Sequence, residues 1–199
     1  MTQITTVAQL EALYGDVAPA SLDKVATQLT PMYWRWISRS RFCVLSTVGQ
    51  DGTDGSPRGD SEPVVTSPDP QTLLLPDWRG NNRIDTLRNL VVDPRVSLMF
   101  MVPGSDNVVR VNGTAAIETG AICDEFAREG KHPRCVIRVR VAEVYSQCAR
   151  AIKRARLWAG EDESAGLPTA GAFVKEQKAD FDADAYDAAW PARAAKTMW

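Results

Sequence analysis

The sequence is poor in the residues that most hydrolytic and metal sites need. Among its 199 residues there is one histidine, His132, which excludes zinc or iron sites built on several histidines. A Ser-His-Asp or Cys-His triad would have to be built on His132 alone, and this residue lies beside Pro133 in an expected surface loop. We therefore expect no resident metal and little scope for hydrolase chemistry.

Cysteine pairs at metal-binding spacing are also missing. The four cysteines, Cys43, Cys123, Cys135 and Cys148, form no C-x-x-C motif, and their segments have the pattern of strand or helix interiors. Cysteines of this kind in a cytoplasmic chain are usually packing residues. The prediction is a set of reduced, mostly buried thiols.

Long apolar runs and a strong charge of one sign are absent as well. No run approaches the ~20 residues that span a bilayer, and the N-terminus lacks a basic region followed by an apolar core. The net charge of -2 disfavours nucleic acid as a partner. Hydrophobic residues at 44% are typical of a soluble globular protein, so we expect a cytoplasmic protein without a membrane partner.

The chain is predicted to form a single domain over residues 1–199, with helices at both ends. Residues 1–40 are expected to be helical, with a capping box at Thr6, a second helix capped by Ser21 and a third that begins at Thr30 and Pro31. Residues 160–199 are expected to form a linker followed by one short C-terminal helix and tail.

From Phe42 onward the pattern becomes that of strands. The apolar run that starts at Phe42 ends in a predicted turn at Gly49-Gln50-Asp51-Gly52. Five further strands are expected at SEPVVT with the stretch before it, TLLLPD, RVSLMFMV, NVVRVNGTAAI and RCVIRVRVAEVYS, with a turn at Ser67-Pro68-Asp69-Pro70 and a helix over residues 82–93. Hairpin-like pairs with few helical crossovers predict a mainly β fold with flanking helices, closed as a six-stranded antiparallel barrel.

Three polar segments are candidates for binding. Ser56-Pro57-Arg58-Gly59-Asp60 offers the planar donors of Arg58, although a plain turn has the same composition. Asn81, Asn82 and Arg83, with Arg88 further on, stand where a helix is predicted to begin, which suits a phosphate. The alternative there is a simple asparagine N-cap, but an arginine in a first helical turn opposes the dipole and so needs a reason.

The third segment is a basic helix after the last strand. Arg150, Lys153 and Arg154 lie in CARAIKRARLW and could meet an anionic ligand or an acidic partner. The alternative is a solvated basic face. No Walker loop and no G-x-G-x-x-G motif after a strand is found, so a Rossmann dinucleotide site is unsupported.

The order of four blocks resembles the FMN-binding split-barrel family related to pyridoxamine 5'-phosphate oxidase, in particular a subgroup with S-P-R-G-D and G-N-N-R motifs. The blocks are RFCVLSTVGQDGTDGSPRGD, TLLLPDWRGNNRIDTLRNLVVDPRVSLMF, VVRVNGTAAI and CARAIKRARLW. The resemblance covers about residues 30 to 160. It implies a six-stranded split barrel that forms a homodimer, with FMN in a groove between the subunits.

The same resemblance implies roles for individual residues. Ser56 and Arg58 would border the flavin ring and ribityl chain with Asp77 beside them, and Asn82 and Arg83 would hold the phosphate. The basic C-terminal tail that binds pyridoxine phosphate in the true oxidases is not found, so vitamin B6 oxidation is not implied.

The implied function is an FMN-dependent oxidoreductase acting on an unknown small substrate. The alternative is a non-catalytic carrier or sensor of flavin, deazaflavin or a haem-type ligand on the same barrel. In the expected homodimer, the basic helix with Arg150, Lys153 and Arg154 would reach the flavin of the partner subunit. A barrel of six short strands has little interior left for a tricyclic ring once its own apolar side chains fill it, so the cofactor is expected outside the barrel.

Overall fold

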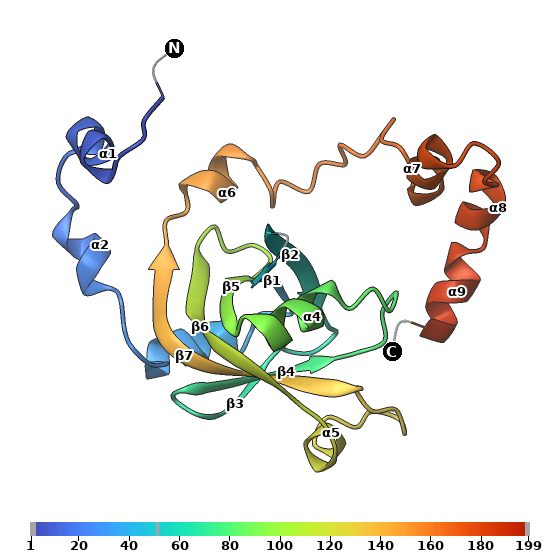
Figure 1. The fold of residues 1–199 in the computed structure, drawn as a ribbon, viewed down its shortest axis with the longest axis horizontal. Coiled ribbons are helices and arrows are strands. Elements are labelled where there is room, and N and C mark those ends of the chain that lie inside the picture. The colour runs from blue at the N-terminus through green and yellow to red at the C-terminus, as the bar shows by residue number, and fades with distance from the viewer. Residues whose placement is uncertain (1–2, 51, 198–199) are drawn as a thin grey trace.

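The computed structural model describes residues 3–50 and 52–197, so Asp51 of the predicted turn and the last two residues of the predicted C-terminal tail lie outside it. The chain forms one antiparallel sheet flanked by helices (Figure 1). The strands are β1 (Phe42–Gly49), β2 (Gly52–Gly59), β3 (Thr66–Asp69), β4 (Thr72–Asp77), β5 (Arg95–Met101), β6 (Val108–Glu118) and β7 (Cys135–Gln147).

The sheet differs from the prediction in strand number and closure. It has seven strands in the order β2-β1-β5-β6-β7-β4-β3, and in the described part of the chain β2 and β3 are its two edges. The prediction of a closed six-stranded barrel was therefore wrong, while the mainly antiparallel sheet with flanking helices is confirmed and is consistent with a split barrel.

Two prolines explain the error. Ser-Pro-Arg-Gly and Ser-Pro-Asp-Pro have turn composition, yet Pro57 lies inside β2 and Pro68 inside β3. Both are edge strands, where a residue without an N–H is tolerated because one side of the strand has no neighbour to bond. The predicted turn at Ser67-Pro68-Asp69-Pro70 is thus largely the extra strand.

The strands curve around an apolar core that is filled by their own side chains. Leu98, Phe100 and Val111 have no measurable exposure, and Val96 and Val109 are also buried. Complete burial of side chains of this size contributes about 1.5–3 kcal/mol each. Strand β7 alternates, with Ile137 and Val139 inward and Arg138 paired to Glu118 at 2.7 Å on the other face.

The N-terminal helices agree with the prediction at two of their starts. Thr6 forms the capping box with Gln9, and the Thr30 side chain accepts a hydrogen bond from the Tyr33 N–H at 3.3 Å. The second helix instead begins with Pro19 after the N-cap Ala18, so the prediction of a Ser21 cap was wrong. The three helices are α1 (Val7–Tyr14), α2 (Pro19–Asp23) and α3 (Pro31–Ile37).

Of the remaining helices, one follows β4 in the chain, one follows β6, and the last four follow β7. The single C-terminal helix that was predicted is in fact a set of three, which lie at one side of the molecule, opposite α1 and α2 (Figure 1). No helix in residues 3–50 and 52–197 is long and apolar enough to cross a membrane. The helices are α4 (Asp85–Val92), α5 (Ala121–Asp124), α6 (Arg150–Arg154), α7 (Ala170–Gln177), α8 (Ala183–Ala188) and α9 (Trp190–Thr197).

Candidate functional site

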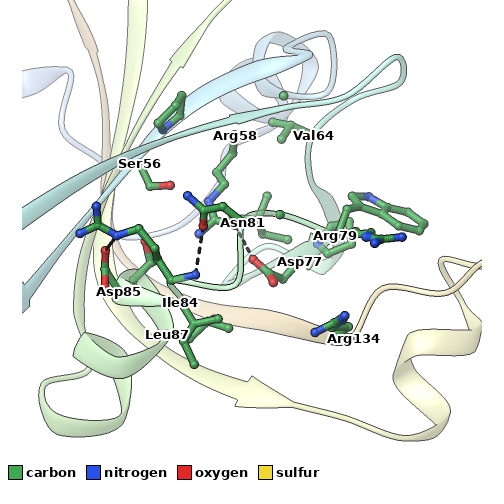
Figure 2. A pocket seen from close by; sticks show the side chains of 18 of the residues that line it. Ser56, Arg58, Val64, Asp77, Arg79, Asn81, Ile84, Asp85, Leu87 and Arg134 are labelled. Carbon is green, nitrogen blue, oxygen red and sulfur yellow. Dashed lines mark hydrogen bonds and ion pairs between the residues drawn. The ribbon is translucent and has the colours of Figure 1, made fainter. Parts of the chain in front are cut away.

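A groove of about 940 Å³ runs between β2, the end of β4 and the start of α4 (Figure 2). It brings together most of the predicted site residues, which come from segments far apart in the sequence. Those that line it are Ser56, Arg58, Asp77, Asn81, Asn82 and Arg83. The groove is therefore the place where the predicted binding segments meet.

The alternation of β2 supplies one wall of the groove. Asp54, Ser56 and Arg58 are half-buried while the residues between them are exposed. Successive residues of a strand point to opposite faces, so the S-P-R-G sequence turns Ser56 and Arg58 to the same side. Figure 2 shows both side chains on that side of the groove.

Arg58 is held in place by Asp77, the last residue of β4. Their side chains form an ion pair and are only 19% and 14% exposed. The Nε of Arg58 is buried and has no hydrogen-bond partner within the described residues. Because buried donors are normally bonded, this guanidinium has a donor left for a ligand.

The connection before α4 departs from the predicted helix start. The helix begins at Asp85, and its N-cap is Ile84, which is left-handed with φ 53° and offers no side-chain cap. Asn81 accepts a hydrogen bond from the N–H of Arg83 at 3.0 Å instead of capping the helix. The alternative of an asparagine N-cap is therefore contradicted. Asparagine also bonds locally in turns and tolerates the left-handed region, as Asn82 does at φ 61°.

This geometry changes the electrostatic argument for Arg83. The residue lies just before the helix rather than in its first turn, and its charge, which is still close to the positive end of the helix dipole, is paired with Asp85. The first turn of α4 nevertheless borders the groove through Thr86 and Leu87, and its N–H groups have no side-chain cap. The positive end of the helix therefore lies at the groove.

Helix α4 is anchored so that this end stays at the groove. The Thr86 hydroxyl donates to Asp54 at 3.0 Å, and the Asn89 amide donates to the Thr47 hydroxyl at 3.0 Å. Leu90 is buried in the core below. These contacts tie the helix to the β1–β2 hairpin.

Three further arginines line the groove, and Figure 2 shows Arg79 on the opposite side from Asp85. Arg83 forms an ion pair with Asp85 at 2.9 Å, and both side chains are well exposed. Arg79 and Arg134 also line the groove, and within the described residues neither has a carboxylate partner. Two cations are thus available to an anionic group.

Arg134 is a groove residue that the sequence reasoning missed. Its Nη1 donates to the Asn82 side chain at 3.2 Å, and its N–H donates to the carbonyl of Asp77 at 3.1 Å. It reaches the groove because β4 and β7 pair with Asp77 opposite Cys135. No local motif signals this pairing register, so the sequence held no direct sign of it.

Four predicted site residues lie elsewhere. They are exposed and do not line the groove of their own chain: Arg88 on α4, and Arg150, Lys153 and Arg154 on α6. The Nζ of Lys153 forms an ion pair with Oδ2 of Asp106 at 3.6 Å. Their roles toward a ligand stay predictions.

The cysteines and the histidine are not part of the groove. Cys43, Cys123 and Cys135 are buried and free, and Cys148 is exposed, which confirms the prediction of mostly buried thiols. Burial raises the pKa of Cys43 to about 12 and that of Cys135 to about 11, so both remain neutral. His132 is exposed, as expected for a surface loop, and its Nδ1 lies 3.0 Å from Oδ1 of Asp124.

Comparison with known families identifies the chain. The family model of pyridoxamine 5'-phosphate oxidase matches residues 17–148, which is more than half of the sequence. The chain belongs to this family. The matched region contains every strand and the whole groove.

Several solved structures are similar to this chain. HupZ of Group A Streptococcus has 18% identity and a TM-score of 0.49, over 59% of this chain and 93% of that one. A candidate pyridoxamine 5'-phosphate oxidase from Lactobacillus delbrueckii has 21% identity and a TM-score of 0.49, over 60% and 95%. The FAD binding protein from Mycobacterium smegmatis has 13% and 0.42, over 61% and 97%. No curated protein matches the sequence significantly.

Proposed function

We propose that the groove binds FMN and that the protein is an FMN-dependent oxidoreductase acting on a small substrate. The observation that carries the proposal is the state of Arg58: Asp77 holds it in the groove, and its buried Nε has no acceptor among the residues that the structure describes. Membership of the pyridoxamine 5'-phosphate oxidase family supports the same ligand class. The donor set fits a flavin, which has a polar ring edge and an anionic tail.

The two ends of the groove suit the two ends of such a ligand. Asn82 and Arg83, with the uncapped start of α4, would hold the phosphate. Ser56 and Arg58 would lie along the ring and ribityl chain, and the charge of Arg58 would stabilise negative charge on the ring edge. A bound flavin supplies hydride and electron transfer, for which no histidine base is needed.

A visible absorption spectrum of the purified protein tests the ligand. The expected result is a yellow protein with flavin bands, or a colourless one that takes up added FMN. Deazaflavin or haem bands, or no uptake of FMN, would contradict the assignment. Steady-state oxidation of reduced nicotinamide with common acceptors then separates an enzyme from a carrier, since a carrier shows no turnover.

The phosphate assignment predicts a selective defect in Arg83→Ala. Loss of one charge-assisted hydrogen bond should weaken FMN binding by about 1.5–3 kcal/mol and leave riboflavin binding almost unchanged. Fluorescence titration measures both affinities. Arg95→Ala is the matched control, because the exposed Arg95 also forms an ion pair with an aspartate two residues away, Asp93, and does not line the groove. An equal loss of both ligands in Arg83→Ala would remove its phosphate role.

We also propose a homodimer in which each flavin contacts both subunits. The basic helix α6 supports this, because Arg150 and Arg154 are exposed and do not line the groove of their own chain. Dilution, or an interface substitution, should then release FMN as the dimer dissociates. Light scattering with flavin fluorescence follows both events. A folded monomer that keeps FMN tightly bound would contradict the shared site.

A further inference from the structure

One wall of the groove is shared with a second cavity. Asp60 and Trp78 line the groove from the ends of β2 and β4. Arg128, in the segment between α5 and β7, lines a neighbouring hollow of about 440 Å³ that also includes Leu74 and Phe126. Because Arg128 contacts both Asp60 and Trp78, it stands between the two cavities.

Asp60 fixes the guanidinium of Arg128. Their side chains form an ion pair, and that of Asp60 is only 3% exposed. The same carboxylate oxygen accepts the N–H of Glu62 at 3.1 Å and the hydroxyl of Ser61 at 3.3 Å. A carboxylate with three donors has little freedom, so Arg128 has a fixed anchor.

Arg128 in turn lies over the indole of Trp78. Its guanidinium carbon is 5.4 Å from the ring centroid, within the range of a cation–π contact. Trp78 also packs against a small buried cluster of Leu74, Cys123, Phe126 and Val136. The indole is therefore confined by the cluster and by the guanidinium.

The backbone presents Arg128 for this contact. Arg128 and Lys131 form a two-way bridge, with N–H to carbonyl distances of 2.9 and 2.8 Å, around a turn at Glu129 and Gly130. Both turn residues have positive φ, 49° and 76°. A closed turn of this kind holds the direction of Arg128 toward Trp78.

We propose that Arg128 is a positioning residue, which together with Asp60 holds Trp78 as a fixed wall of the groove and so sets its shape for a flat ring. The inference rests on the proposed function for the identity of the ring. It assigns to the segment between α5 and β7, through Arg128, a part in setting the shape of the groove.

The substitution that tests this must keep Asp60 paired. Arg128→Ala would leave a buried carboxylate without its cation, which is strongly destabilising and would obscure the result. Arg128→Lys keeps the charge but removes the planar group over the indole. Lys131→Ala, an exposed position in the same turn, is the matched control.

The first measurement needs no ligand. In protein labelled with ¹⁵N-tryptophan, the signal that disappears in Trp78→Leu is the indole of Trp78. We expect Arg128→Lys to shift this signal and Lys131→Ala to leave it in place. An unshifted signal in Arg128→Lys would overturn the positioning role, whether or not the protein binds a flavin.

The second measurement is affinity for riboflavin and FMN. Arg128→Lys should weaken both by the same factor, about three- to tenfold, and should have no further effect in a Trp78→Leu background. A loss confined to FMN, or an equal loss in the Trp78→Leu background, would overturn the proposal. If the unmodified protein binds neither ligand, the proposed function fails, and the indole signal still decides whether Arg128 fixes Trp78.

Discussion

We expect Arg58→Ala to lose FMN and riboflavin alike, with affinities at least about 100-fold lower, or about 2.8 kcal/mol. The substitution removes the donor at the ring and leaves the 14% exposed side chain of Asp77 facing the ligand without its cation. Any flavin that still binds should have a more negative reduction potential, because a positive charge near the reduced ring is lost. Fluorescence titration and a spectroscopic redox titration measure these quantities.

Asp77, which forms the ion pair with Arg58, provides a test in which the reduction potential should shift in the opposite direction. Asp77→Asn removes the negative charge and keeps Arg58, so the potential of the bound flavin should become more positive. Arg95→Ala should change neither the affinity for flavin nor its reduction potential, since Arg95 does not line the groove. Unchanged potentials in both Arg58→Ala and Asp77→Asn would exclude an electronic role for the pair.

The second large effect concerns folding. Gly113 lies in β6 at a register shift against β7, and a Cβ at this position would be 2.0 Å from the backbone carbonyl oxygen of Arg140. Backbone cannot move aside as a flexible side chain can, so Gly113→Ala should destabilise the protein by about 3 kcal/mol or more. Urea unfolding followed by circular dichroism measures the free energy of unfolding.

Gly80→Ala is the control for this prediction. A Cβ at Gly80 meets no heavy atom within 4 Å, and its φ is not in the left-handed region. Its free energy of unfolding should change by less than about 1 kcal/mol. If Gly113→Ala is equally mild, β6 and β7 can adjust their spacing at this shift.

The strands of the core could be predicted because their burial follows a simple period. Leu98 and Phe100 in β5, and Ile137 and Val139 in β7, alternate with more exposed residues along strands that face one core. The edge strands could not be predicted in this way. Proline and glycine indicate a turn when only neighbours in sequence are known, and their compatibility with a strand depends on whether another strand lies beside them.

The site was predictable in its segments and not in its contacts. Arg58 lies in the S-P-R-G-D motif and Asp77 was implied by the family resemblance, and the structure brings them into one ion pair. Arg134 reaches the groove through the pairing of β4 with β7, and Arg128 contacts Asp60, which lies 68 residues earlier in the chain. Both depend on long-range geometry, for which hydrophobic periodicity carries no information.

The unclosed sheet has a consequence for association between molecules. An open edge offers unpaired backbone groups to any other strand, and long flat edges promote aggregation. Pro57 in β2 and Pro68 in β3 offer no N–H to such a strand, and Asp54 and Arg58 add charge to the first of these edges. The strand that lines the groove is thus also the one that hinders separate copies from stacking into a continuous fibrillar sheet.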